Sequence, residues 1–173
     1  MKKIILMLML LSFLFGCGSR KVSLVHYIST LEHIKILPPT PEERKAIDSL
    51  KSVALTALEK CQKENGNCID DIEKFGPTGA TFKGGVNNFR KILFENFKIH
   101  SNTKKGENRI CITIGKQNTI EKVDFLSYTD DASRKEIERL FQLKELNNWY
   151  SAKVNRYTVK QEFEISIFIE EKR

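Results

Sequence analysis

The sequence predicts an α+β protein, in which a small antiparallel sheet of three strands carries two helices and is preceded by an N-terminal helix. The first observation is that apolar and polar residues alternate, as in half-buried strands, in 109–114, 120–128 and 159–169. The second is that apolar residues recur at helical spacing in 41–63, 87–97 and 131–143. The order after the first helix is αββαβ, which favours one layer of helices on one face of the sheet.

Residues 1–16 have the pattern of an export signal. Lys2 and Lys3 are followed by an apolar run, Ile4–Phe15, which only Ser12 interrupts. A membrane-spanning helix needs about 20 residues, so this run has the length of a signal-peptide core instead. The segment ends in Leu14-Phe15-Gly16-Cys17, which resembles the bacterial lipobox of Leu, any residue, Gly or Ala, and Cys.

The lipobox resemblance implies that cleavage leaves Cys17 as the first mature residue, carrying palmitate or a similar lipid. Two or more acyl chains anchor a protein stably, whereas one chain holds it only weakly. Two other interpretations remain open: an uncleaved membrane anchor, and an ordinary signal peptide with an unrelated Cys. Gly18–Lys21 contain neither an Asp beside the Cys nor an acidic run. We therefore expect the outer membrane, facing the periplasm, ahead of the inner membrane or the cell surface.

Residues 17–40 are predicted to form the anchor and an arm. Apolar residues recur there every three positions, as Val22, Val25, Ile28, Leu31 and Ile34. This spacing favours a short helix or an irregular packed arm. Pro38-Pro39 then ends whichever structure precedes it.

The segment 41–75 is predicted to be helical over most of its length. Thr40 and Glu43 form a capping box, and Pro41 suits the first helical position. An apolar stripe follows, made of Ile47, Leu50, Val53 or Ala54, Ala57 and Leu58. The helix should therefore run from 41 to about 63 and stop at the Asn65-Gly66 turn.

Three cysteines follow Cys17. Cys61 and Cys68 flank the turn, and an exported protein meets an oxidising compartment, so a disulfide between them is predicted. Closing so short a loop is worth about 2.5 kcal/mol in the loop-entropy model. Cys111 lies in a strand pattern, which favours a small buried apolar side chain.

The segment 80–173 is predicted to be a domain of its own, after a boundary rich in Gly and Pro at 76–79. Its opening, Phe82-Lys83-Gly84-Gly85, resembles the Phe-Pro-Gly-Gly start of TonB C-terminal domains of the Bacteroidetes type, with Lys83 in place of the usual Pro. Further similarities follow in the family's order: the hairpin of Arg109–Ile114 and Ile120–Val123, the second helix at Glu136–Leu143, and Trp149 with the strand that ends at Ile169. The resemblance covers about 82–170 and implies a TonB-C-like αββαβ fold.

The resemblance also implies a function, because in the family a segment of an outer-membrane receptor adds as a strand beside the last strand of the domain. The corresponding edge here is made of Val159, Lys160, Gln161, Glu162, Phe163, Glu164, Ile165 and Ser166. The same charges also suit an edge that is merely protected against aggregation. No Pro-rich spacer or motor-coupling helix is present, so we expect a peptide-binding adaptor associated with outer-membrane transport. The receptor's N-terminal peptide would be its partner.

Catalysis finds little support in the sequence. His26, His33 and His100 are isolated, no nucleophile motif is present, and no Cys/His set has metal-ligand spacing. We therefore expect no catalytic residues, no metal and no cofactor. Lys and Arg outnumber Asp and Glu by 29 to 22, but the two signs are interspersed, which favours solvated faces over a nucleic-acid site.

One rival hypothesis belongs to a different class of protein. In it the chain is a structural or interaction lipoprotein that uses the fold only as a scaffold. The helix 41–63 then covers the sheet or forms a dimer, since its apolar stripe has no assigned partner. The oligomeric state does not follow from the sequence.

Overall fold

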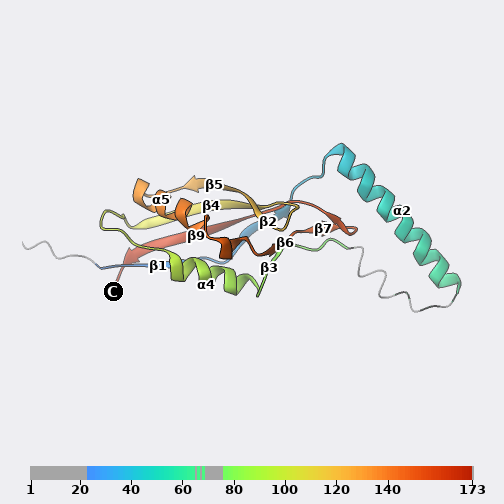
Figure 1. Cartoon of the computed structure of the whole chain (residues 1–173), viewed down its shortest axis with the longest axis horizontal. Coiled ribbons are helices and arrows are strands. Elements are labelled where there is room, and N and C mark those ends of the chain that lie inside the picture. The colour runs from blue at the N-terminus through green and yellow to red at the C-terminus, as the bar shows by residue number, and fades with distance from the viewer. Residues whose placement is uncertain (1–22, 65, 67, 69–75, 173) are drawn as a thin grey trace, which may run out of the picture.

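The computed structural model describes residues 23–64, 66, 68 and 76–172, so the predicted signal segment and Cys17 lie outside the described residues. The chain is a mixed α+β protein built on an antiparallel sheet in the order β1-β9-β4-β5, in which β2 also pairs with β9 (Figure 1). The sheet therefore has five strands where three were predicted. They are β1 Leu24–Ile28, β2 Glu32–Ile36, β4 Gly106–Ile114, β5 Ile120–Ser127 and β9 Gln161–Glu171.

The prediction of a short helix or irregular arm before Pro38 was wrong. Residues 24–28 and 32–36 are the strands β1 and β2, and both pair with β9. The spacing of three suggested a helix, but the backbone N–H and C=O groups of this segment form hydrogen bonds with β9, which lies near the C-terminus. A boundary at residue 80 consequently separates strands that share one sheet.

One layer of helices packs on one face of this sheet. It contains α4, Val86–Asn96, and α5, Asp131–Leu140. Their buried side chains join alternate residues of β4 and β9 in one core: Phe89, Leu93, Ile137, Leu140, Ile110, Ile112, Ile114, Phe163, Ile165, Ile167 and Ile169. Because alternate strand residues point to the same face, the period of two in β4 and β9 puts these side chains under the helices, as predicted.

The ends of the two helices are set by local chemistry. Asp130 caps α5 by accepting a hydrogen bond from the Ser133 backbone N–H at 2.9 Å. The Lys104 backbone N–H donates to the same carboxylate at 2.9 Å, which fixes the 97–105 loop to the helix start. Gly84 and Gly85 precede α4 with φ of 86° and 85°, a left-handed turn that glycine adopts without strain.

A buried aromatic cluster closes one end of the core. The short strands β3, Thr81–Phe82, and β6, Trp149–Tyr150, pair so that Phe82 lies opposite Trp149. The Trp149 ring lies 5.0 Å from Phe89 and 5.4 Å from Phe163, measured between centroids. Its indole N–H donates to the Leu146 carbonyl at 2.9 Å. Trp149 is thus a core residue, as expected when a buried indole finds a hydrogen-bond partner.

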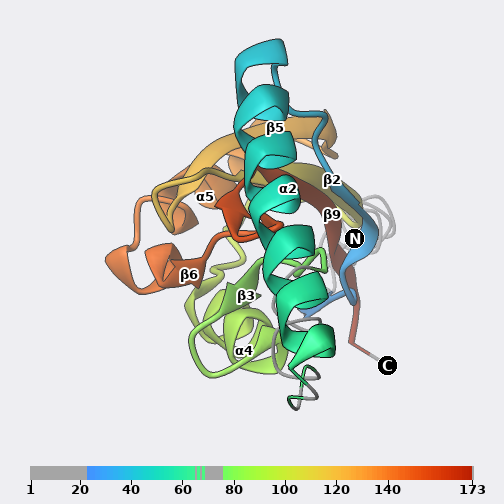
Figure 2. The same ribbon diagram turned by 90° about the vertical axis from the view of Figure 1, so that its right-hand side faces the viewer.

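Helix α2, Pro41–Lys63, begins with the predicted capping box. The Glu43 backbone N–H donates to the Thr40 hydroxyl at 3.3 Å, and the Thr40 N–H donates to the Glu43 carboxylate at 2.7 Å. Only Ile47 joins a core cluster, with Ala152 and Val159. Figures 1 and 2 show that α2 runs past the end of the sheet rather than across its face, so it does not cover the sheet.

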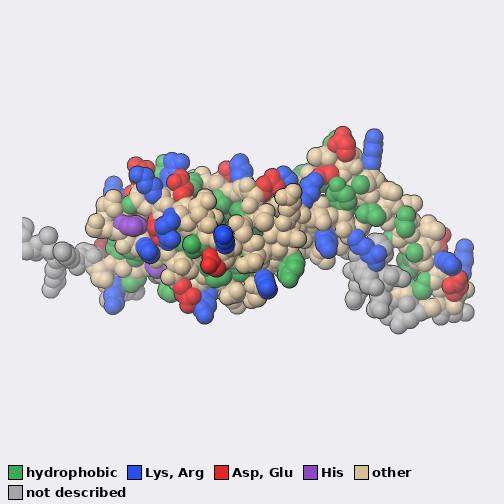
Figure 3. Space-filling view, in the orientation of Figure 1, with side chains coloured by type: hydrophobic (Ala, Val, Ile, Leu, Met, Phe, Trp, Pro, Cys, Tyr) green, Lys and Arg blue, Asp and Glu red, His purple; other side chains and the backbone are tan. Residues whose placement is uncertain are grey.

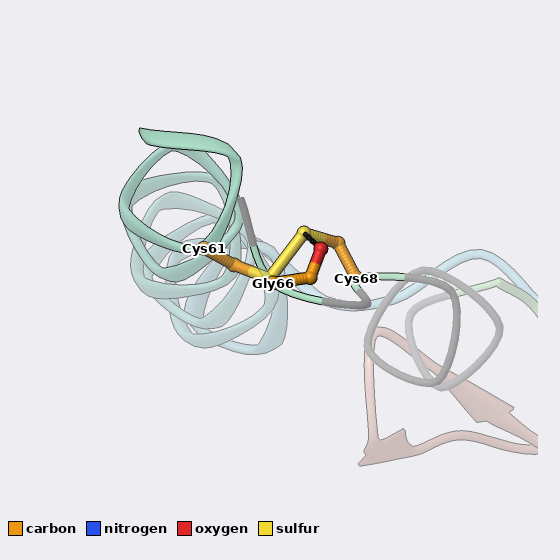
Figure 4. The surroundings of a disulfide bond; sticks show 3 residues. All are labelled: Cys61, Gly66 and Cys68. Atoms are coloured by element: carbon orange, nitrogen blue, oxygen red, sulfur yellow. Dashed lines mark hydrogen bonds between the residues drawn. A yellow bond between two sulfur atoms is a disulfide. The ribbon is translucent and has the colours of Figure 1, made fainter. Parts of the chain in front are cut away.

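The predicted disulfide is present in the structure. Cys61 near the end of α2 is joined to Cys68, with Gly66 beside the bond (Figure 4). The Gly66 backbone N–H donates to the Cys61 carbonyl at 3.0 Å. A Cβ at Gly66 would come within 3.0 Å of the Cys61 sulfur, which explains a glycine at this position.

Acidic and basic side chains are interspersed over the face of the molecule drawn in Figure 3. This agrees with the solvated, mixed-charge surface predicted from the sequence. Within the described ranges, no helix has the length and apolar character needed to cross a membrane.

Candidate peptide-binding edge

The outer edge of β9 was the predicted binding site, but this edge is not open. β9 pairs with β4 on one side and with the chain's own β1 and β2 on the other. β1 covers Ile167–Glu171, which we call the β1 half of the edge. β2 covers Gln161–Glu164, which we call the β2 half. The predicted edge over 159–166 is therefore already occupied, because a segment about 130 residues away in the sequence forms backbone hydrogen bonds with that strand.

The β1 half is closed firmly. The Arg90 side chain of α4 donates hydrogen bonds to the carbonyls of Ile28 and Ser29 at 2.7 and 2.6 Å. His26 Nε2 lies 2.9 Å from the Phe94 carbonyl, and Ile28 is buried in the core. β1 is thus held by side chains and helix contacts as well as by its ladder with β9.

The β2 half is closed more weakly. Every β2 residue except Ile36 is exposed. Ile36 packs beside Ala152 and Val159, and the Leu37 backbone N–H donates to the Lys160 carbonyl at 2.9 Å. Lys35 forms an ion pair with Glu162 at 2.6 Å, although 65% of its side chain is exposed. Exposed ion pairs contribute little to stability, so β2 is held mainly by backbone hydrogen bonds and by Ile36.

The two halves meet at Ser29 and Ser166. The Ser29 backbone N–H donates to the Ser166 carbonyl at 2.9 Å, and the Ser166 N–H donates to the Ser29 hydroxyl at 2.9 Å. Leu31, two residues further on, packs against the main core. The firmly held segment therefore extends as far as Leu31, just before β2 begins.

The predicted site residues divide between the two faces of β9. Val159, Gln161, Phe163 and Ile165 are buried, and the Gln161 side chain accepts a hydrogen bond from the Ala80 N–H at 3.0 Å. Ser166 is also buried, and its hydroxyl donates to Glu107. Lys160 is paired with Glu121. Glu162 and Glu164 lie on the other face, where they are only half-buried.

The face of the sheet opposite the helices carries a small charged network beside β2. Arg109 of β4 lies 2.6 Å from Glu164 and 3.4 Å from Glu32. Cys111 is on the same face and is half-buried, not fully buried as predicted. Burial raises the pKa of its thiol, and the charges of Glu162, Glu164 and Asp124 raise it further. Cys111 is therefore a protonated thiol at neutral pH and a poor nucleophile.

A pocket of about 350 Å³ lies where β2 leaves the sheet. Its lining combines the turn after β2 with the chain just before β9: Leu37, Pro38, Pro39, Thr40, Glu43, Lys116, Val159 and Lys160. A strand longer than β2 would reach this pocket. The sequence contains no signal for it, because its walls come from three distant segments.

The three histidines, all in the described part of the chain, do not lie close together and do not form a metal site. His26 lies on β1, His33 on β2, and His100 lies 3.3 Å from Glu136 of α5. Among the residues that the structure describes, no group of three His, Cys, Asp or Glu side chains could hold a metal ion.

The architecture and this edge define a class: an α+β domain whose terminal strand is covered by its own N-terminal segment. Comparison of the chain with models of known families, with curated proteins and with solved structures found no match.

Proposed function

We propose that this chain is a lipid-anchored periplasmic adaptor with a TonB-C-like domain, which binds an extended peptide as a strand on the β2 half of β9 after β2 leaves. One observation carries the proposal: this half is closed by a strand whose side chains are almost all exposed. An incoming strand would form main-chain hydrogen bonds with β9 in place of those of β2, so the exchange costs few side-chain contacts.

The contacts on either side of β2 support a local exchange. Ser29 and Leu31 hold the chain before β2, and Ile47 docks α2 after it. β2 would therefore leave as a loop tethered at both ends while β1 and α2 stay in place. A tethered strand has a high effective concentration and acts as an internal competitor of the peptide.

The predicted anchor also suits this site. Cys17 precedes Leu24, the first residue of β1, by seven positions, which span at most about 25 Å when extended. A lipid on Cys17 would hold β1 and the β9 edge close to the membrane. On the inner leaflet of the outer membrane, this edge would lie within reach of receptors whose N-terminal peptides are in the periplasm.

Replacing the predicted lipidation site tests the anchor. We expect Cys17→Ser to remain in the soluble fraction of lysed cells and to incorporate no labelled palmitate, whereas the wild-type chain sediments with outer-membrane vesicles and is labelled. Gly18→Ser serves as a control, because it changes a neighbouring residue and keeps the thiol. Cleavage of the wild-type protein by protease added to intact cells would contradict the periplasmic orientation.

A covalent lock tests the exchange itself. Lys35 and Glu162 lie opposite each other in the ladder, so Lys35→Cys with Glu162→Cys, in a Cys111→Ser background, should cross-link β2 to β9. We expect N-terminal peptides of outer-membrane receptors encoded in the same genome to shift the amide signals of 160–165 in the reduced form only. Lys35→Ser with Glu162→Ser is the matched control that cannot cross-link.

The scaffold hypothesis makes the opposite prediction. It is favoured by the same finding that β9 is paired on both sides, since a filled edge needs no ligand. If receptor peptides shift no amides in the wild-type chain, in the reduced locked variant or in its serine control, the adaptor proposal fails and the scaffold remains.

A further inference from the structure

β2 contains one irregularity in its pairing with β9, between Glu32 and Lys35. Glu32 pairs with Glu164 and Lys35 pairs with Glu162, so His33 and Ile34 together oppose the single residue Phe163. This is a β-bulge. His33 has a φ of 48°, in the left-handed region that side chains disfavour. Ile34 remains 57% exposed, so the extra residue gains little burial in return.

The charged residues along the β2 half of the edge favour particular charges in the strand that pairs with it. Glu162 meets the ammonium group of Lys35 at 2.6 Å, so a basic residue suits this position. One pair along, Glu164 is joined to Arg109, whose Nη2 lies 3.4 Å from the Glu32 carboxylate. Arg109 thereby allows an acidic residue opposite Glu164, which would otherwise be a repulsive pair.

An apolar position follows the basic one. Ile36 lies opposite Gln161 and packs with Val159, Ala152 and Ile47. It is the one β2 side chain that is partly removed from solvent. A ligand at this edge therefore gains most of its apolar burial at the residue opposite Gln161.

From these contacts we infer that the ligand of the β2 half is a straight strand with the order acidic, any residue, basic, apolar, opposite Glu164, Phe163, Glu162 and Gln161. β2 carries the same order with one residue too many and is thus a built-in weak competitor for the ligand. This inference rests on the proposed strand exchange and adds the chemistry of the peptide. A straight ligand continues the ladder through Phe163 without a left-handed residue.

Three labelled peptides test the inference on the whole mature chain by fluorescence anisotropy. The first is the native sequence of residues 31–37, Leu-Glu-His-Ile-Lys-Ile-Leu. The second omits the histidine, giving Leu-Glu-Ile-Lys-Ile-Leu, and the third exchanges the charges, giving Leu-Lys-Ile-Glu-Ile-Leu. We expect the second peptide to bind about tenfold more tightly than the first, because bulge strain changes affinity by roughly this factor. We expect about the same factor over the third peptide, because exchanging the charges reverses two charge pairs together.

Charge reversal in the protein provides the matched test. In Glu162→Lys the preference between the second and third peptides should shrink at least several-fold, because the basic residue then faces a lysine. Glu170→Lys makes the same charge change on the same strand but in the β1 half, opposite Val25, and should leave the preference unchanged.

The outcomes separate this inference from the proposed function. Equal binding of the second and third peptides to the wild-type chain would overturn the charge order while leaving strand exchange intact. Equal binding of the first and second would overturn the role of the bulge. If none of the peptides binds, and none binds when β2 is weakened by Ile36→Ser, both the inference and the exchange are wrong.

Discussion

Replacement of Trp149 by Ala is expected to lower the free energy of unfolding by about 3–5 kcal/mol, the range for large aromatic side chains in cores. Trp149 is 3% exposed and contacts Phe82, Phe89 and Phe163. Its loss leaves a cavity where β6, α4 and β9 meet, and it removes the hydrogen bond to Leu146. A domain of this size has a total stability of about 5–15 kcal/mol, so this loss would remove a large fraction of it.

Urea denaturation followed by circular dichroism measures this effect. Trp149→Phe keeps most of the ring volume and should cost about 1–2 kcal/mol. Tyr150→Ala is the control, because the neighbouring side chain is 59% exposed and should change stability by about 0.5 kcal/mol or less. A loss below about 1 kcal/mol in Trp149→Ala would mean that the aromatic cluster does not form the end of the core.

The second large effect is expected at Glu136, a nearly fully buried carboxylate on α5. It accepts hydrogen bonds from the Lys98 backbone N–H at 2.8 Å and from Arg139 at 2.6 and 2.8 Å, and His100 lies 3.3 Å away. Glu136→Ala leaves the Lys98 N–H without its acceptor and frees the segment after α4. Because hydrogen bonds to charged groups are worth about 1.5–3 kcal/mol, we expect a loss of about 2–4 kcal/mol.

Arg134→Ala is the control for Glu136→Ala, because it lies on the same helix but its ion pair with Glu138 is about half-exposed. It should cost less than about 1 kcal/mol. Equal losses in the two variants, measured by the same denaturation, would contradict the role assigned to Glu136.

The same site predicts how stability depends on pH. Burial raises the pKa of Glu136, but hydrogen bonds from Arg139, Lys98 and His100 outweigh it and lower the pKa below its ordinary value. A carboxylate with a lowered pKa stabilises the fold above its unfolded pKa, near 4.5, and this stabilisation is lost as the pH falls through the folded pKa. In Glu136→Gln the free energy of unfolding should therefore vary less with pH below about 4.5.

Asp130 extends the pH dependence of stability to lower pH. Burial raises its pKa, but the N–H groups of Lys104 and Ser133 and two hydroxyls lower it to about 2. Its contribution is complete above 3.8 and is lost between 3.8 and about 2. Glu136→Gln should therefore keep a decline in this lower window, because Asp130 is intact, but a smaller one than the wild-type chain shows.

Local patterns in the sequence predicted much of the fold correctly. The capping box at Thr40 and Glu43, the hairpin of β4 and β5 and the alternation of β9 all depend on residues that are close together in the chain. The Cys61–Cys68 bridge also follows from a short turn between the two residues. Chemistry of this kind acts over a few residues, so it is visible without the tertiary structure.

The arm before Pro38 shows where local patterns fail. Its apolar residues recur every three positions, yet it forms β1 and β2. A strand is normally predicted from alternating apolar and polar residues. In β2 the bulge at His33 interrupts this alternation, so the sequence does not indicate a strand. The partner strand, more than 120 residues away, decides its conformation.

Describing the candidate peptide-binding edge requires both kinds of information. From the sequence follow the last strand, its buried and charged faces, and the residues Glu162 and Glu164 that an added strand would meet. The long-range pairing alone reveals that β1 and β2 already occupy this edge, β1 firmly and β2 weakly. The physical reason is that any backbone can pair with any other. Which segment does so is set by the packing of Ile28, Arg90 and Ile36 in three dimensions.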